Sequence, residues 1–262
     1  MAVNKLQNKS QCPKSSWQFG FGIWVLFWIL VFEVWISARA EAYTWNTVTK
    51  GLEYAYTDNV HAFKIDPKLF QFSVFTAKDI KETDSTANML AKKSGAVLAI
   101  NGGFFSPSQK SLGLLMREGE VLNPMHKTKW WGVFYRNGRT SNIVPPDVFQ
   151  FQPGIEMALQ AGPRLVVDGK IPKLKEAVAR RSGIGIQKNG EIVIAITDET
   201  PKTLQEFATM FQKPEEKGGF GCPNALNLDG GRSSQLYFDY SGFKLDISGI
   251  ARVTNAITVF PR

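Results

Sequence analysis

Cysteine and histidine are scarce in this sequence, with two of each among 262 residues. Cys12 precedes a long apolar run, so Cys222 is alone in the rest of the chain and no intrachain disulfide can form there. This excludes a small scaffold held together by disulfides and indicates a core that is stable without them. Because His61 and His126 are both remote from Cys222 in sequence, we interpret Cys222 as a buried or loop thiol rather than a nucleophile.

Motifs for metal and nucleic-acid binding are also missing. The chain has no H-E-x-x-H pattern, no closely spaced cysteine pair and no EF-hand loop, so we expect no metal site and no cofactor. A divalent cation near Asp229 stays open as an alternative, because sites built from carboxylate oxygens leave little trace in a sequence. Nucleic acid is not an expected partner, since no binding module for it is recognisable. Repeats and low-complexity segments are absent as well.

The first 40 residues differ in character from the rest. Three lysines precede an apolar run over residues 19–36 that only Glu33 interrupts, and Ala-Arg-Ala follows at 38–40. This order is typical of a secretory signal. The run also approaches the ~20 residues of a membrane span, so an uncleaved anchor is the alternative, although Glu33 and the Ala-x-Ala pattern favour cleavage. In both cases we expect residues 41–262 to be one exported domain, periplasmic or extracellular, that touches the membrane only through an uncleaved N-terminal segment.

The formal net charge is +8. Three lysines and Arg39 lie in the first 40 residues, so the remainder is less basic than this total implies. Its lysines are scattered along the chain, among them Lys127, Lys129, Lys173 and Lys175. A solvated surface is the simpler interpretation, and attraction to anionic glycans or phosphate polymers is the alternative.

The apolar patterning predicts a strand-rich fold with few helices. Residues 54–57 and 70–75 alternate between apolar and polar, as strands do. Asn137-Gly138 predicts a hairpin turn, and helices are expected over 84–93 and 203–211. Further strands are expected at 96–100, 130–135, 182–187, 191–197, 235–238 and 254–260. The sequence therefore predicts an α+β fold, with antiparallel or mixed β-sheets flanked by a few helices in a single domain.

Two segments with a double glycine carry the strongest functional signal. Both have a strand-like lead-in and an asparagine, and they read Asn101-Gly102-Gly103 and Asn227-Leu228-Asp229-Gly230-Gly231-Arg232-Ser233-Ser234. Glycine lets a ligand approach the backbone closely, and successive N–H groups in such turns can form an anion-binding nest. We expect the two segments to meet in one polar site built on loops at sheet ends.

Five ordered blocks, spanning roughly residues 95 to 260, resemble the phosphodiester glycosidase family. They lie at 101–105, 160–169, 181–185, 226–234 and 253–257. Two departures stand out. Ser182-Gly183 replaces the family's Thr-Ala, and Arg232 replaces its third glycine, which either adds a phosphate contact or narrows the pocket.

The resemblance implies a hydrolase that cleaves the glycosidic bond of a sugar-1-phosphodiester in an envelope or exported glycan. Its partner would then be a carbohydrate phosphodiester. Such cleavage passes through an oxocarbenium-like transition state, and carboxylates usually catalyse it. The leaving group is a phosphate monoester, whose second pKa is about 6, so it needs less protonation than an alcohol does. Two alternatives remain: a non-catalytic glycan-binding or envelope-assembly protein that uses the same pocket, and a phosphodiesterase that cuts the other P–O bond.

Asp229 is the first candidate for the catalytic carboxylate, and its alternative role is to cap the turn before Gly230. Asp198, after the strand expected at 191–197, is the second candidate, with a strand-end surface residue as the alternative. Arg181 is the first candidate for phosphate contact, because a guanidinium matches phosphate oxygens in a bidentate way. The alternative is a solvated surface pair with Arg180, and the next candidates are Arg232 and Arg164.

The remaining candidates surround these groups. Asn101 and Asn227 either hydrogen-bond sugar hydroxyls or satisfy turn backbone. Ser233 and Ser234 either bind ligand or, for Ser234, act as a nucleophile, although no G-x-S-x-G elbow supports that role. Trp130 and Trp131 are candidates for stacking on a sugar ring. The glycines expected to shape the loops or offer N–H donors to substrate are Gly102, Gly103, Gly162, Gly230 and Gly231.

Overall fold

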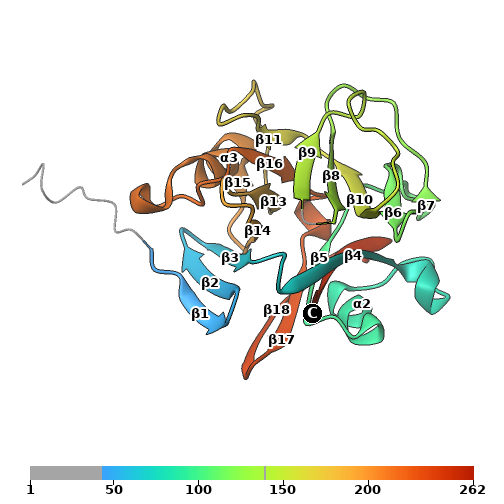
Figure 1. Ribbon diagram of the computed structural model, residues 1–262, viewed down its shortest axis with the longest axis horizontal. Coiled ribbons are helices and arrows are strands. Elements are labelled where there is room, and N and C mark those ends of the chain that lie inside the picture. The colour runs from blue at the N-terminus through green and yellow to red at the C-terminus, as the bar shows by residue number, and fades with distance from the viewer. Residues whose placement is uncertain (1–42, 139) are drawn as a thin grey trace, which may run out of the picture. The chain divides into compact units, whose positions relative to one another are not determined.

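The computed structural model describes residues 43–138 and 140–262 (Figure 1). The predicted leader or anchor at residues 1–40 lies outside the described residues. Within the part of the chain that is described, no helix is long and apolar enough to cross a membrane.

The described residues form three larger β-sheets in which every strand pairing is antiparallel. A small two-stranded ladder joins β12 (Val178–Ala179) to β15 (Lys202–Thr203). The seven-stranded sheet consists, in spatial order, of β1 (Asn46–Thr49), β2 (Leu52–Thr57), β3 (Val60–Ile65), β14 (Ile192–Thr197), β13 (Ser182–Ile186), β16 (Asn224–Asn227) and β11 (Arg164–Val166).

The other two sheets have five strands each. One contains, in order, β7 (Glu120–Asn123), β6 (Leu115–Arg117), β10 (Ile155–Ala161), β8 (Gly132–Asn137) and β9 (Thr140–Val144). The other contains β18 (Phe243–Ile247), β17 (Leu236–Tyr240), β5 (Leu98–Asn101), β19 (Asn255–Pro261) and β4 (Phe70–Thr76).

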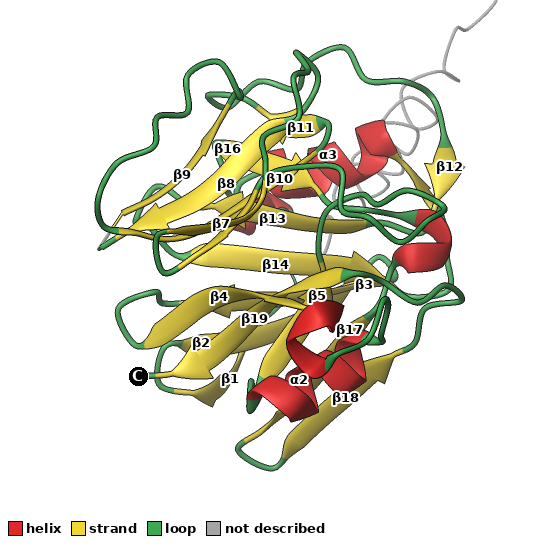
Figure 2. Ribbon diagram, turned by 90° about the vertical axis from the view of Figure 1, so that its right-hand side faces the viewer, coloured by secondary structure: helices red, strands yellow, loops and turns green. Residues whose placement is uncertain are grey.

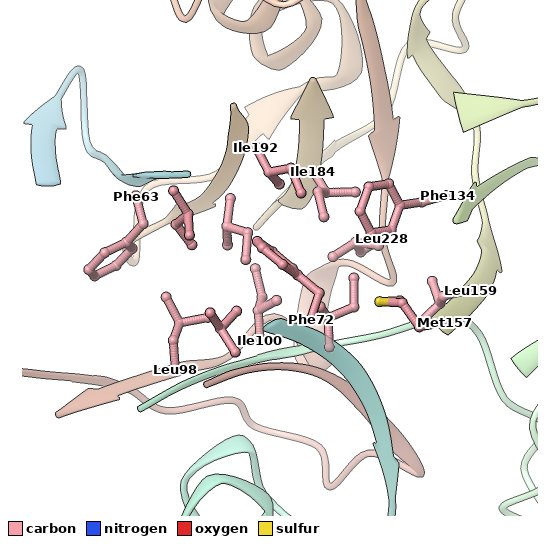
Figure 3. Packing of buried hydrophobic residues seen from close by; sticks show 14 of the residues in the cluster. Phe63, Phe72, Leu98, Ile100, Phe134, Met157, Leu159, Ile184, Ile192 and Leu228 are labelled. Carbon is pink, nitrogen blue, oxygen red and sulfur yellow. The ribbon is translucent and has the colours of Figure 1, made fainter. Parts of the chain in front are cut away.

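The main hydrophobic core lies where the three sheets face one another (Figure 3). Ile184 and Ile192 come from the seven-stranded sheet, Phe72 and Ile100 from the sheet of β5, and Phe134 from the sheet of β8. All five side chains are almost completely buried. Because each sheet places one apolar face in this core, the strand ends remain at its margin, where loops can gather polar groups.

Two α-helices pack on outer faces of the sheets (Figure 2). α2 (Ala87–Ser94) begins after the Thr86 cap and lies against β5 and β17. α3 (Leu204–Gln212) begins with a capping box, in which Thr203 and Glu206 bond each other's backbone N–H groups, and it lies against β11 and β16. Short 3-10 turns occupy Ala77–Ile80, Glu215–Lys217 and Gly231–Ser233.

The α+β expectation is confirmed, as are both predicted helices and the Asn137-Gly138 hairpin that joins β8 to β9. Two details differ. Trp130 lies before β8 rather than in it, and β18 was not expected from the sequence. The alternation of Phe243, Leu245 and Ile247 with polar residues could have predicted this strand. β18 is an edge strand, and these three side chains are only half-buried.

Gly183 lets α3 approach the seven-stranded sheet closely. A Cβ added at this position would lie 2.8 Å from Cε1 of Phe207. We therefore expect Gly183→Ala to lower the free energy of unfolding by about 1–3 kcal/mol through overpacking. In a double-mutant cycle measured by urea denaturation, Phe207→Leu should recover part of this loss, because it shortens the opposing side chain. Unchanged stability of Gly183→Ala would contradict the packing argument.

Candidate active site

Three candidate residues lie together at one edge of the seven-stranded sheet. β14 and β16 run parallel to each other with β13 antiparallel between them, so their C-terminal ends share an edge. Asp198 follows β14 and Asp229 lies two residues beyond β16, while Arg181 immediately precedes β13. Two backbone hydrogen bonds fix this arrangement, from Thr197 N to Arg181 O at 2.9 Å and from Leu228 N to Ser182 O at 2.8 Å.

The two double-glycine segments meet at this edge. The Asp229 N–H donates to the Gly102 carbonyl at 3.0 Å, and the Asn101 side-chain amide donates to the Asp229 carbonyl at 2.7 Å. The contact of Asn101 with Asp229 joins residues 128 positions apart in sequence. The main chain of Asp229 is therefore held on both sides by the first segment.

Asn101 is completely buried, and its side chain is fully engaged within the protein. Besides donating to Asp229, its Oδ1 accepts from the Ser182 hydroxyl at 2.7 Å and from the Gln235 N–H at 3.1 Å. This favours the backbone alternative over contact with a sugar hydroxyl. We assign Asn101 to positioning of the two segments.

The glycine N–H groups do not form the expected anion-binding nest. Gly102 N donates to Asn255 O and Gly103 N to Asn255 Oδ1. Gly230 N donates to the Asp229 carboxylate, and Gly231 N to the Arg180 carbonyl. Each of these donors is used inside the protein, which favours the alternative that the glycines shape the two loops.

Close packing explains the need for glycine at these positions instead. A Cβ on Gly102 would lie 2.1 Å from Oδ1 of Asn255, and one on Gly103 would lie 2.6 Å from the Gln160 carbonyl oxygen. Gly162 is pressed against Trp131 in the same way, at 2.7 Å. Gly231 has open space around it, but its φ of 61° lies in the left-handed region that favours glycine.

The Asp229 carboxyl group is partly buried, and this burial raises its pKa above the ordinary aspartate value. Hydrogen bonds from the Ser233 side chain and the Gly230 N–H oppose the rise without cancelling it. No ion pair joins Asp229 to a cation among the described residues. A partly buried carboxyl group with a raised pKa is suited to the role of a general acid, a general base or a nucleophile.

Asp198 is in a different environment at the same edge. Burial acts to raise its pKa, but hydrogen bonds from the Thr200 N–H and the Tyr56 hydroxyl outweigh it, so the net shift of the pKa is downward. The Tyr56 hydroxyl donates to Asp198 at 2.7 Å, and the Thr200 N–H donates at 2.7 Å. These contacts describe a turn-capping carboxylate, which favours the strand-end alternative for Asp198.

Arg181 is a buried cation without a carboxylate partner among residues 43–138 and 140–262. Its Nε donates to the Lys202 carbonyl at 3.0 Å and its Nη2 to the Ala177 carbonyl. Nη1 lies 3.8 Å from the position of a Cβ built on Gly230, next to Asp229. Burial lowers the pKa of Arg181.

The other arginines are placed differently. Arg180 does not form the solvated pair with Arg181 that was the alternative, because its Nε and Nη1 donate to the carbonyls of Asp198 and Ser248. Arg232 is exposed on the turn beyond Asp229, where it can reach a ligand from solvent. Arg164 lies in β11, and its aliphatic stem packs where Gly132 leaves room.

Asn227 and the two serines are buried side chains that flank Asp229 in the sequence. Asn227 is 4% exposed and donates to the Gly162 carbonyl, while its Oδ1 has no hydrogen-bond partner among the described residues. Ser233 is buried against Asp229. Ser234 is fully buried with an unpartnered hydroxyl, which argues against a nucleophile that must reach substrate.

A cavity of about 340 Å³ shares neighbours with these groups, although Arg181, Asp198 and Asp229 are not among its lining residues. Of the residues that line it, Phe104 follows Gly103, Gly162 accepts from Asn227, and Leu204 follows Lys202 by two positions. The other lining residues are Thr128, Trp130, Trp131, Pro163, Lys173, Leu174 and Lys175. Its volume is within the range of roughly 300–1,000 Å³ that is typical of small-molecule sites.

Sequence reasoning missed the residues that connect the site. Asn255 is 1% exposed and accepts from Gly103, and Ser182 donates to Asn101. Both residues lie in blocks that carry the family resemblance, and this was the signal that could have identified them. Neither an asparagine nor a serine by itself indicates a connecting role. Among the described residues no group of three or more His, Cys, Asp or Glu side chains is arranged to hold a metal ion.

The family model for phosphodiester glycosidases matches residues 94–260. The chain belongs to this family. The uncharacterized protein YigE of Escherichia coli K12 is 29% identical over 190 residues, which are 66% of this chain and 72% of YigE.

Solved structures share the fold. The zebrafish N-acetylglucosamine-1-phosphodiester alpha-N-acetylglucosaminidase catalytic domain, auto-inhibited by its pro-peptide, matches with a TM-score of 0.63 at 16% identity, covering 84% of this chain and 82% of that domain. A hypothetical protein from Synechocystis matches with a TM-score of 0.54 at 18% identity over 84% of this chain, which spans 61% of that protein's length. A protein of Burkholderia pseudomallei K96243 matches with a TM-score of 0.56 at 11% identity, over 80% of this chain and 74% of that one.

Replacing Asn101 should loosen both segments at once. We expect Asn101→Ala to lower the free energy of unfolding by about 2–4 kcal/mol, because the Ser182 hydroxyl, the Gln235 N–H and the Asp229 carbonyl each lose a buried partner. Urea denaturation measures the loss, with the exposed Asn46→Ala as the matched control. Equal stability of the two variants would contradict the positioning role.

Neutralising Asp229 should not destabilise the protein at pH 7. Because its folded-state pKa is raised, the wild type loses stability as pH rises from the unfolded pKa of about 3.9 through the folded value. We therefore expect Asp229→Asn to melt at or above the wild-type temperature at pH 7, with an advantage that shrinks as pH falls to the unfolded pKa. Thermal melts from pH 3.5 to 8 test this, with the exposed Asp147→Asn as control. A marked loss of stability at pH 7 would show that the ionised carboxylate supports the fold.

Proposed function

We propose that the protein is an exported hydrolase that cleaves the glycosidic bond of a sugar-1-phosphodiester in an envelope or exported glycan. The observation that carries this proposal is the buried Arg181 guanidinium, which has no carboxylate partner among the described residues and whose Nη1 approaches the backbone of Gly230, the residue after Asp229. A buried cation without a partner is costly, and a phosphate group would compensate it. Membership of the phosphodiester glycosidase family supplies the reaction class.

The reaction adds water across the bond between the anomeric carbon and the phosphodiester oxygen. The anomeric carbon gains the water oxygen, the C–O bond breaks, and its electron pair leaves with the phosphate as a monoester. The monoester is a good leaving group, with a second pKa of about 6. Stabilising its developing charge therefore matters more than protonating it, and Arg181 is the group in position to do so.

Asp229 acts at the sugar side of the broken bond. As a carboxylate it stabilises the positive charge that develops at the anomeric carbon, directly or by activating water. Its raised pKa predicts that kcat/KM falls with decreasing pH at a value above that of an ordinary aspartate. Arg232, exposed beyond the turn, contacts the part of the substrate that leaves with phosphate.

The test uses the methyl ester of N-acetylglucosamine 1-phosphate in a panel of sugar-1-phosphodiesters. We expect turnover by the wild type, no turnover by Asp229→Asn, and a kcat/KM for Arg181→Lys that is lower by about 10²–10³-fold, since a lysine cannot reproduce the planar guanidinium. Arg232→Lys is the matched exposed control and should lose far less activity. Hydrolysis in ¹⁸O-water should label the sugar.

Three outcomes would contradict the proposal. Label in the phosphate would show cleavage of the P–O bond and a phosphodiesterase. Binding of glycans without cleavage of any phosphodiester would show a glycan-binding or assembly protein. Full activity of Arg181→Lys would remove the role of the guanidinium.

A further inference from the structure

The cavity lined by Phe104 and Gly162 has an exposed aromatic side chain on its wall. Trp130 is 68% exposed although it is among the largest side chains in the chain. Its neighbour Trp131 packs inward on Phe104, with ring centroids 4.8 Å apart, and on His126, at 4.9 Å. Trp131 therefore holds the loop in place while Trp130 remains available on the cavity wall. Aromatic side chains together with a few polar groups are typical of the lining of ligand pockets.

The same cavity is lined by cations. Lys173 and Lys175 both contribute to its wall, and Lys127 and Lys129 flank Thr128, another lining residue. All four lysines are exposed, and none takes part in an ion pair within residues 43–138 and 140–262. The two loop segments at 126–131 and 170–176 together contain five lysines and one acidic residue, Glu176. Their positive charge is therefore largely uncompensated.

These charges are separate from the group assigned to the scissile phosphate. Arg181 is buried and lies beside Gly230, whereas Lys173 and Lys175 are exposed on a loop that begins after β11. The loop runs from these lysines to Ala177, whose carbonyl accepts from Arg181. Because Ala177 is only two residues beyond Lys175, this loop brings the cavity, with its aromatic face and its lysines, close to Arg181.

We propose that this cavity binds a sugar carrying a second phosphodiester, so that the substrate is a polyanionic glycan with repeating sugar-phosphodiester units. This inference rests on the proposed function and deepens it. Trp130 contacts the face of the sugar ring, and Lys173 and Lys175 hold its phosphate as point charges. A repeating polymer supplies the second phosphate at a fixed spacing from the first, which a glycan with a single phosphodiester does not.

The experiment compares three phosphonate-linked probes that the protein cannot hydrolyse. The first contains one N-acetylglucosamine 1-phosphonate unit with a methyl ester. The second joins two such units and carries two charges. The third has the same two sugars, but a neutral glycosidic linkage replaces the second charged group. Calorimetric titration at low and high salt measures their affinities.

We expect the wild type to bind the doubly charged probe roughly tenfold more tightly than the neutral-linked one at low salt, and this preference should shrink at high salt because the lysines are exposed. Lys173→Gln/Lys175→Gln should abolish the preference, whereas Lys92→Gln/Lys93→Gln, an exposed pair on α2, should keep it. Trp130→Ala should weaken both two-sugar probes by a similar factor, with the exposed Phe151→Ala as control.

Equal affinity for the charged and neutral two-sugar probes would overturn the inference, as would an equal effect of the two lysine pairs. Cleavage of the simple methyl diester by the wild type is measured in parallel. If that diester is cleaved but the charge preference is missing, the inference fails and the proposed function stands. If the preference depends on Lys173 and Lys175 but no diester is cleaved, the anionic pocket stands and the hydrolase function fails.

Discussion

The buried side chain of Asn101 is the interaction on which the site depends. Its one amide group bonds the Asp229 carbonyl, the Ser182 hydroxyl and the Gln235 N–H, which come from two separate parts of the chain. These bonds tie the Asp229 turn to β13 and to β5, the strand that carries Asn101. The main chain that carries the Asp229 carboxyl group is therefore fixed by buried hydrogen bonds, and these are costly to break.

Local sequence signals were sufficient for most of the fold. Thr203 and Glu206 indicate the start of α3, because a capping box is a contact between residues close in sequence. Asn137-Gly138 indicates a hairpin, because few residue pairs adopt the backbone geometry of its turn. β18 was not predicted, because its apolar residues lie at a sheet edge and are only half-buried, which makes the alternation of apolar and polar residues a weaker signal. How three sheets share one core depends on contacts between distant segments, and no local pattern specifies them.

The sequence predicted that the two double-glycine segments meet, but it did not specify the roles of their residues. The structure confirms the meeting through the contacts of Asp229 with Asn101 and Gly102. The roles follow from hydrogen bonds between residues far apart in sequence, such as Gly103 with Asn255 or Gly231 with Arg180. A sequence shows that glycine is present but not whether it serves a ligand or a close backbone contact. The added-Cβ distances at Gly102 and Gly103 identify close packing as the reason.

The different environments of the two aspartates argue for one catalytic carboxylate rather than a pair. Burial raises the pKa of Asp229, whereas hydrogen bonds from Thr200 and Tyr56 hold the pKa of Asp198 down. β13 separates β14 from β16, so the two aspartates follow strands that are not neighbours in the sheet. The hydrogen bonds of Asp198 engage its carboxylate in the turn that it caps. A phosphate leaving group removes the need for a strong second acid, so a single carboxylate is consistent with the proposed reaction.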